Sequence, residues 1–228
     1  MRNTNRVIGI ITAIAALGCS SEDTTRLGES QQAFHSWNGY HWKSDSLSPT
    51  VADKTRSSLY DVPGSVADWS TVASNLDPVM SLKKSGKVTV SEGFSLDWLG
   101  LAQVWLEDGH IVKGAVKLNT TFLEPRGAHV AQHVLCQELG HVWGLDHNRF
   151  DLDTCMNDCG DATTQDEWEA CLAAPSSDTP NAHDYEELSN IYGHGDPGAE
   201  GSGGGKPCKG NNPKCNGSVV VHVFPLYE

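Results

Sequence analysis

The sequence predicts an α+β domain, and three observations support this fold class. Short runs of aromatic and β-branched residues alternate with polar residues in the first part of the chain, as they do in strands. Two later segments instead place apolar residues at helical spacing. The 228 residues, with 38% hydrophobic content and seven tryptophans, are enough for one folded domain with appendages.

The N-terminal segment, residues 1–19, is typical of an export signal with a lipobox. Arginines precede an apolar run from Val7 to Leu17, which is too short to span a bilayer as a helix. The motif ALGC resembles a bacterial lipoprotein box, in which Cys19 becomes the lipidated first residue and anchors the chain to a membrane. Ordinary cleavage nearby, followed by free secretion, is the alternative. Both interpretations place the mature protein outside the cytosol.

The net charge and the cysteine content indicate which partners the mature protein can bind and which compartment it occupies. Loss of Arg2 and Arg6 with the signal lowers the net charge from −13 to −15. So acidic a protein is repelled by nucleic acid, which is therefore not an expected partner. Six cysteines follow Cys19, an even number that favours disulfides in an oxidising compartment: Cys136, Cys155, Cys159, Cys171, Cys208 and Cys215. The last two flank a turn-rich loop and are expected to pair with each other.

The first half of the domain is predicted to be rich in strands. Residues 20–34 are polar without periodicity, which is typical of a tether, and the domain itself is predicted over 35–194. Strand-like alternation predicts three strands, over 87–93, 101–106 and 111–118. Asp108-Gly109 between the last two predicts a hairpin turn.

Two helices are predicted to follow the strands. Residues 128–145 contain no proline and repeat apolar residues at helical spacing, which predicts a helix that ends near Gly144. A second helix is predicted to start at Pro180 and Asn181 and to end at Gly193.

The C-terminal segment is predicted to lie beyond a flexible connection. The composition of 195–206 predicts a Gly-rich linker. Its GSGGGK stretch is not a phosphate loop, because Glu200 and Pro207 occupy positions that the fingerprint reserves for other residues. Residues 207–228 are predicted to be a small disulfide-closed segment, either a hairpin or a strand docked on the main domain.

The stretch CQELGHVWGLDH carries the chemistry of the chain. On a helix, Gln137 and His141 lie one turn apart on one face, with Glu138 beside them. A metal held by that face sits where the carboxylate of Glu138 reaches a metal-bound water. Gly144 lets the chain turn sharply, so that His147 returns as a third ligand.

This pattern resembles the HExxHxxGxxH signature of the metzincin zinc peptidases, with Gln137 in place of the first histidine. Met156, nine residues after His147, is placed like the residue of their methionine turn. The final helix, with Asp184 and an Ile-Tyr-Gly ending, resembles the last helix of matrixin catalytic domains. The resemblance covers roughly 35–192, and its specific motifs lie in the last third.

The resemblance implies a matrixin-like fold with a twisted mixed sheet, an antiparallel edge strand, an active-site helix, a methionine turn and a C-terminal helix. It further implies a zinc endopeptidase that hydrolyses protein or peptide substrates. Zinc is expected on Gln137, His141 and His147, and Glu138 is expected to act as general base.

The same resemblance implies a disulfide pairing. In a metzincin fold the active-site helix packs over the methionine turn, so Cys136 and Cys155 are expected to form a disulfide there. Cys159 and Cys171 then remain as a pair.

Gln137 leaves more than one function open. A carboxamide oxygen leaves zinc its full charge but binds it less tightly than imidazole, so a weaker zinc site in an active enzyme is expected. The alternative is a pseudopeptidase that serves as a surface-binding module, and a third possibility is another metal that tolerates oxygen ligands. His133, one turn before Gln137, is expected either to hydrogen-bond the amide from the second shell or to face solvent.

The remaining acidic residues and histidines carry no motif. The segment DLDTCMNDCGDA is too irregular for a calcium loop, so structural Ca²⁺ is unsupported and a solvated acidic loop is expected. Surface or structural roles are expected for the isolated histidines at positions 35, 41, 110, 183 and 194.

Overall fold

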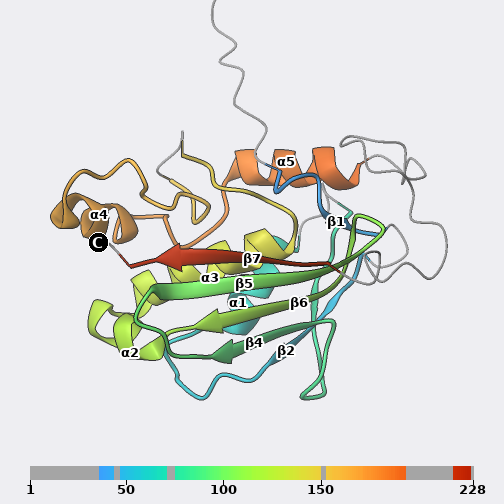
Figure 1. Ribbon diagram of the computed structural model, residues 1–228, viewed down its shortest axis with the longest axis horizontal. Coiled ribbons are helices and arrows are strands. Elements are labelled where there is room, and N and C mark those ends of the chain that lie inside the picture. The colour runs from blue at the N-terminus through green and yellow to red at the C-terminus, as the bar shows by residue number, and fades with distance from the viewer. Residues whose placement is uncertain (1–35, 44–46, 71–74, 150–152, 194–217, 227–228) are drawn as a thin grey trace, which may run out of the picture. The chain divides into compact units, whose positions relative to one another are not determined.

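A computed structural model of the chain describes residues 36–43, 47–70, 75–149, 153–193 and 218–226 (Figure 1). The predicted export signal, Cys19, the tether, the Gly-rich linker and the Cys208–Cys215 pair lie outside the described residues. Among the residues that are described, no helix is both long enough and apolar enough to cross a bilayer.

A mixed seven-stranded sheet forms the centre of the domain, which is therefore of the expected α+β class. The strand order is β3-β2-β4-β6-β5-β7, and β1 also pairs with β6. Strands β2, β4 and β6 run parallel, whereas β5 is antiparallel to β6, and β7 is antiparallel to β5. The strands are β1 (His41–Trp42), β2 (Thr50–Asp53), β3 (Val79–Met80), β4 (Val88–Glu92), β5 (Trp98–Glu107), β6 (His110–Leu118) and β7 (Ser218–Pro225).

The three strands predicted from alternation are present as β4, β5 and β6, although β5 begins at Trp98 rather than at residue 101. Asp108 and Gly109 join β5 to β6 with φ values of 51° and 82°. Two successive positive φ angles are what a tight hairpin turn requires, and Asp-Gly adopts them at low cost. This hairpin fixes the register between β5 and β6.

The helices pack beside the sheet, and α3 (Ala128–Val142) is the one that carries the chemistry. It lies against β5 and β6 (Figure 1). Gly114 on β6 permits this close approach, because a Cβ there would lie 2.5 Å from Val142 Cγ1. The other helical elements are α1 (Val62–Trp69), α2 (Thr120–Leu123), a 3-10 turn (Glu124–Arg126), α4 (Gln165–Leu172) and α5 (Ala182–Tyr192).

The second predicted helix is α5, and its capping explains where it starts. The side chain of Asn181 accepts hydrogen bonds from the first-turn N–H groups of His183 and Asp184, while the Asp184 carboxylate accepts from the N–H of Asn181. At the other end, the Tyr192 hydroxyl donates to the carbonyl of Trp143 at 2.7 Å. The helix therefore supports the chain just beyond the end of α3.

The C-terminal segment contributes a strand to the main sheet, one of the two forms that the sequence left open. Residues of β7 pair with β5 from Trp98 to Leu106. The side chains of β7 alternate: Val219, Val221 and Val223 are exposed, whereas Phe224 is fully buried. The strand thus closes the outer edge of β5 and points one face at the helix layer.

Candidate metal centre

The second half of α3 is fully buried and presents the polar residues of the motif inside the protein. Gln137, Glu138 and His141 are each 0% exposed. After the helix, Gly144 adopts a φ of 100°, and a Cβ there would collide with the carbonyl oxygen of Tyr40. A side chain at this turn is therefore excluded, and the chain reverses as the sequence predicts.

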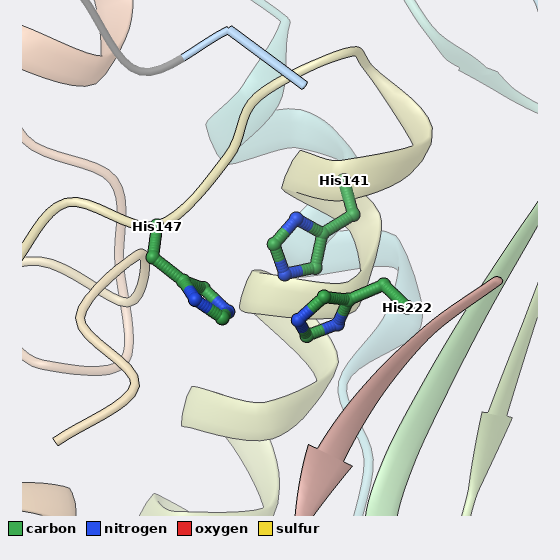
Figure 2. Close-up of side chains that lie close together, drawn as sticks. All are labelled: His141, His147 and His222. Atoms are coloured by element: carbon green, nitrogen blue, oxygen red, sulfur yellow. The ribbon is translucent and has the colours of Figure 1, made fainter. Parts of the chain in front are cut away.

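Three imidazoles meet at this place, those of His141 on α3, His147 after the turn and His222 on β7 (Figure 2). One ligand atom from each histidine lies within 4.8 Å of the others. The ring of His222 lies 3.7 Å from that of His141 and 4.6 Å from that of His147, measured between centroids. Ligand atoms that lie this close together can bind one metal ion.

The hydrogen bonds of the first two histidines leave their remaining nitrogens open. His141 Nδ1 lies 2.8 Å from the carbonyl oxygen of Leu145, which can only accept, so Nδ1 carries the proton. His147 Nδ1 lies 2.8 Å from Asp158 Oδ2, nearer than the 3.3 Å to Arg149 Nη2, so it too is the donor. The Nε2 atoms of both rings are buried and accept no hydrogen bond from the described residues. This is the tautomer that a metal requires.

Asp158 is a buried carboxylate that orients His147. Arg149 binds the same carboxylate through Nε at 3.0 Å and through Nη2 at 2.6 Å. Burial alone would raise the pKa of Asp158, but the hydrogen bonds from His147 and Arg149 outweigh it and hold this pKa well below its usual range. The prediction of a solvated acidic loop is therefore wrong for Asp158, because two cationic or polar partners offset its desolvation.

Glu138 lies beside the imidazoles. Burial raises the pKa of this carboxyl, and the proximity of His222 opposes the rise. His222 Nδ1 lies 3.5 Å from Glu138 Oε2, which is too long for a strong hydrogen bond. Gly100 on β5 leaves the space that the carboxylate fills, because a Cβ there would lie 2.7 Å from Glu138 Oε1.

His133 differs from what the sequence predicts of it, whereas the role of Gln137 as a metal ligand stays a prediction. Neither amide atom of Gln137 has a hydrogen-bond partner among the described residues. His133 does not bond this amide, and it does not face solvent either, since it is 0% exposed. Its Nε2 instead lies 3.0 Å from the carbonyl oxygen of Asn157, and burial is the main cause that lowers its pKa to about 4.

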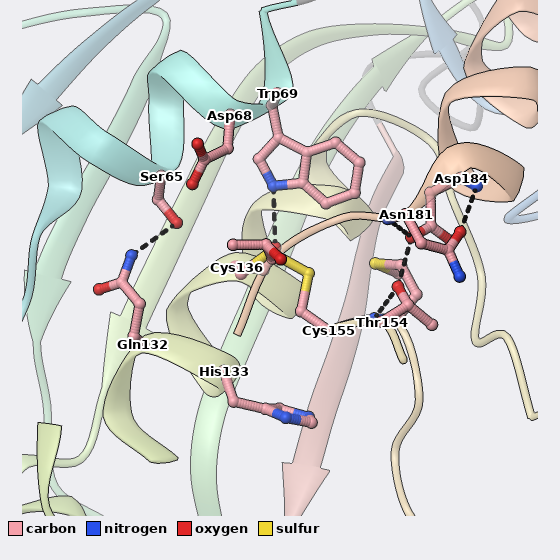
Figure 3. Close-up of a disulfide and its surroundings, with 12 residues drawn as sticks. Ser65, Asp68, Trp69, Gln132, His133, Cys136, Thr154, Cys155, Asn181 and Asp184 are labelled. Carbon is pink, nitrogen blue, oxygen red and sulfur yellow. Dashed lines mark hydrogen bonds between the residues drawn. A yellow bond between two sulfur atoms is a disulfide. The ribbon is translucent and has the colours of Figure 1, made fainter. Parts of the chain in front are cut away.

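A covalent link holds α3 to the loop beneath it, as the sequence predicts. Cys136 on α3 forms a disulfide with Cys155 (Figure 3). Cys159 forms a second disulfide with Cys171. Met156, next to Cys155, is fully buried and packs against Gly140 of α3. Two disulfides agree with an oxidising compartment.

No sequence motif indicates a function for His222, Trp37 or Asp158. Trp37 packs its ring 5.6 Å from that of His141 and 6.1 Å from that of His222, between centroids. One local feature indicates His222: it is a polar residue between Val220 and Phe224, on the inward-facing side of a valine-rich strand. The pairing of β7 with β5 cannot be recognised from the sequence, because the two strands lie far apart along the chain.

A scan against protein-family models and a search of curated proteins both returned no match to this chain.

Proposed function

We propose that this protein is a zinc-dependent endopeptidase of the metzincin type, with Glu138 as its general base. The observation that carries the proposal is the pair of open Nε2 atoms on His141 and His147, which are fixed by their own hydrogen bonds beside a buried carboxylate. Buried polar groups with a purely structural role are normally hydrogen-bonded, so two buried nitrogens without a partner indicate a ligand.

The donors present fit zinc. His141, His147 and His222 offer neutral imidazole nitrogens, which zinc prefers, and the buried amide of Gln137 is a further donor on the helix. The carboxylate of Asp158 behind His147 and the carbonyl of Leu145 behind His141 are the outer partners that zinc-binding histidines use. Bound zinc supplies Lewis acidity toward a peptide carbonyl and toward water.

Glu138 performs the proton transfers of the proposed reaction. Its carboxylate takes a proton from the attacking water and returns it to the nitrogen of the leaving peptide. Burial raises the pKa of this carboxyl above its ordinary value, which suits a group that must both accept and release a proton. Gly100 keeps the space for the side chain open, and the fixed end of α3 holds its position.

The resemblance to matrixin catalytic domains supports the proposal at several independent points. Gly144 makes the sharp turn that brings His147 back to His141. Met156 lies beneath α3, as a methionine turn does, and a capped final helix follows. The departure from the motif at Gln137 bears on how tightly zinc is held and leaves the base in place.

The proposal is tested on the full mature chain by measuring zinc content together with cleavage of an unfolded protein substrate. We expect close to one zinc per chain and slow but measurable cleavage. Glu138→Gln should retain the zinc and lose activity by a factor on the order of 10² to 10⁴, the usual contribution of a general base. Glu186→Gln on the exposed side of α5 is the matched control and should behave like the native protein.

A second candidate function, a binding module without peptidase activity, is favoured by one specific observation. His222 occupies the space next to Glu138, and β7 covers the edge of β5 beside it. Under this alternative the native protein shows neither bound metal nor cleavage, and Gln137→His restores both. Elemental analysis of the same samples would also detect a different metal.

We also propose that the mature chain is anchored outside the cytosol by lipid on Cys19. The lipobox motif and the two disulfides support this location. Detergent phase partitioning of the native protein and of Cys19→Ala tests it: the native protein should enter the detergent phase and the variant should not.

A further inference from the structure

The C-terminal strand β7 is docked at the end of the sheet. Among the described strands it pairs with β5 alone, along most of its length. Three of its side chains, Val219, Val221 and Val223, are exposed. On its inner face Phe224 is fully buried, and the polar side chain of His222 lies two residues before it. In the absence of a ligand, the backbone ladder and the inward side chains of Val220 and Phe224 therefore carry the docking.

His222 is placed as a ligand and not as a packing residue. Its partner in the ladder is Ala102, whose small side chain leaves the inner face open in front of α3. The imidazole lies against the rings of His141 and His147 (Figure 2), and its Nδ1 has no hydrogen bond from the described residues. Three imidazoles without hydrogen bonds between them gain little from their mutual proximity unless they share an ion.

The same cluster lacks one imidazole from its own helix. Position 137 on α3 carries a glutamine, so the helix and its turn supply only His141 and His147. With Gln137 this segment offers three ligands, but only two of them are the imidazoles that zinc prefers. A third imidazole is present at the cluster, and it comes from β7.

We propose that His222 is the third imidazole ligand of the metal, and that the metal thereby fastens β7 to β5. This inference rests on the metal centre proposed above and goes beyond it, because it makes metal binding and strand docking one linked equilibrium. A metal that binds three imidazoles with β7 docked, and only two with β7 detached, stabilises the docked form.

The linkage has a consequence for the sheet. When the metal leaves, the inner face of β7 is held by Val220, Phe224 and the ladder, without the bond to His222. The outer edge of β5, beside Glu138, then becomes accessible more often. An open sheet edge is a place where an extended segment can pair.

The proposal is tested by hydrogen–deuterium exchange on the full chain, with and without zinc. In the native protein, zinc should slow exchange in peptides that cover 218–226 by at least about tenfold. His222→Ala should exchange rapidly in this region whether or not zinc is present. Val221→Ala, an exposed neighbour on the same strand, should respond to zinc like the native protein.

Zinc affinity, measured by competition with a chromophoric chelator, provides the second readout. We expect His222→Ala to weaken zinc binding by about 10- to 100-fold or more. Removal of a residue that only hydrogen-bonds a metal ligand already causes a loss of this size. Gln137→Ala should weaken it less. A larger loss in Gln137→Ala, or unchanged affinity in His222→Ala, would overturn the proposal.

The two readouts separate this inference from the proposed function. If the native protein binds zinc and cleaves substrate while exchange in β7 ignores zinc, the inference fails and the peptidase assignment stands. If no variant binds zinc, the metal centre itself is overturned, and this inference with it. Circular dichroism of each variant without zinc confirms that it is folded.

Discussion

Two regions supply the imidazoles of the candidate metal centre, and they are built very differently. The region from α3 to Cys171 is tied by two disulfides, and the polar motif residues of α3 lie fully inside the protein. The region of β7 is a single strand at the end of the sheet, with one large buried side chain.

The difference teaches where the site is rigid and where it can change. His141 and His147 are fixed by hydrogen bonds to Leu145 and Asp158, so their open nitrogens are present before any ligand arrives. His222 has no such bond and depends on the docking of its strand. We therefore expect damage to the first region to affect the whole domain, and damage to the second to act locally.

The largest effect should follow removal of the Cys136–Cys155 disulfide. The double substitution Cys136→Ala/Cys155→Ala should lower the free energy of unfolding by about 2–4 kcal/mol, because it frees a loop within the core. Guanidinium unfolding with and without the change measures this. The Cys159–Cys171 link closes a shorter loop and should cost somewhat less. Equal stability of the native and substituted proteins would contradict the view of a stapled region.

Acid should destabilise the same region through His133. The folded pKa of this histidine is about 4, below its ordinary value of about 6.5, so the unfolded chain binds the proton more tightly. Its contribution is complete above pH about 6.5 and is lost as the pH falls toward 4, by up to about 3 kcal/mol. Urea unfolding across this pH range should show the loss, and His133→Gln should flatten it. A native protein with constant stability over that window would count against the assignment.

Loss of the Asp158 carboxylate, which orients His147, should lower the affinity for zinc and leave the fold intact. Asp158→Ala removes the acceptor of His147 Nδ1, so zinc affinity should fall about 10- to 100-fold, or about 1.4–2.7 kcal/mol. Chelator competition measures the affinity. Asp161→Ala, an exposed neighbour, is the control. If both variants bind zinc equally, Asp158 does not orient a ligand.

The smallest global effect should follow changes in β7. A buried Phe→Ala change ordinarily costs about 3–5 kcal/mol. For Phe224→Ala we expect only about 1 kcal/mol in the free energy of global unfolding, because the strand can detach while the domain stays folded. Exchange in residues 218–226 should rise strongly all the same. Val221→Ala should change global stability by less than about 0.5 kcal/mol. A full-sized global loss in Phe224→Ala would show that β7 is part of the cooperative core.

Local patterns were sufficient to predict α3 and α5, because helical spacing, a glycine stop and a capping box all lie within one segment. The β5–β6 hairpin followed from Asp108-Gly109 for the same reason. His222 could not be placed in this way. Contacts between residues far apart in the chain decide which sheet edge a C-terminal strand pairs with. No motif spacing therefore links a histidine in this valine-rich run to His141.

Asp158 escaped prediction for a related reason. An aspartate in an irregular acidic loop is usually exposed. Its burial is favourable because its carboxylate contacts His147 and Arg149, and the fold brings both side chains to it. His133 shows the opposite case: its position on the helix was correct, but its partner, the carbonyl of Asn157, comes from a loop that the helical pattern does not describe.

The central claim is that imidazoles from these two regions share one metal ion, and X-ray absorption at the zinc edge tests it most directly. Spectra of the zinc-loaded full chain should fit three imidazole ligands in the native protein and two in His222→Ala. A zinc shell with no more imidazoles in the native protein than in His222→Ala, or no bound zinc at all, would contradict the account.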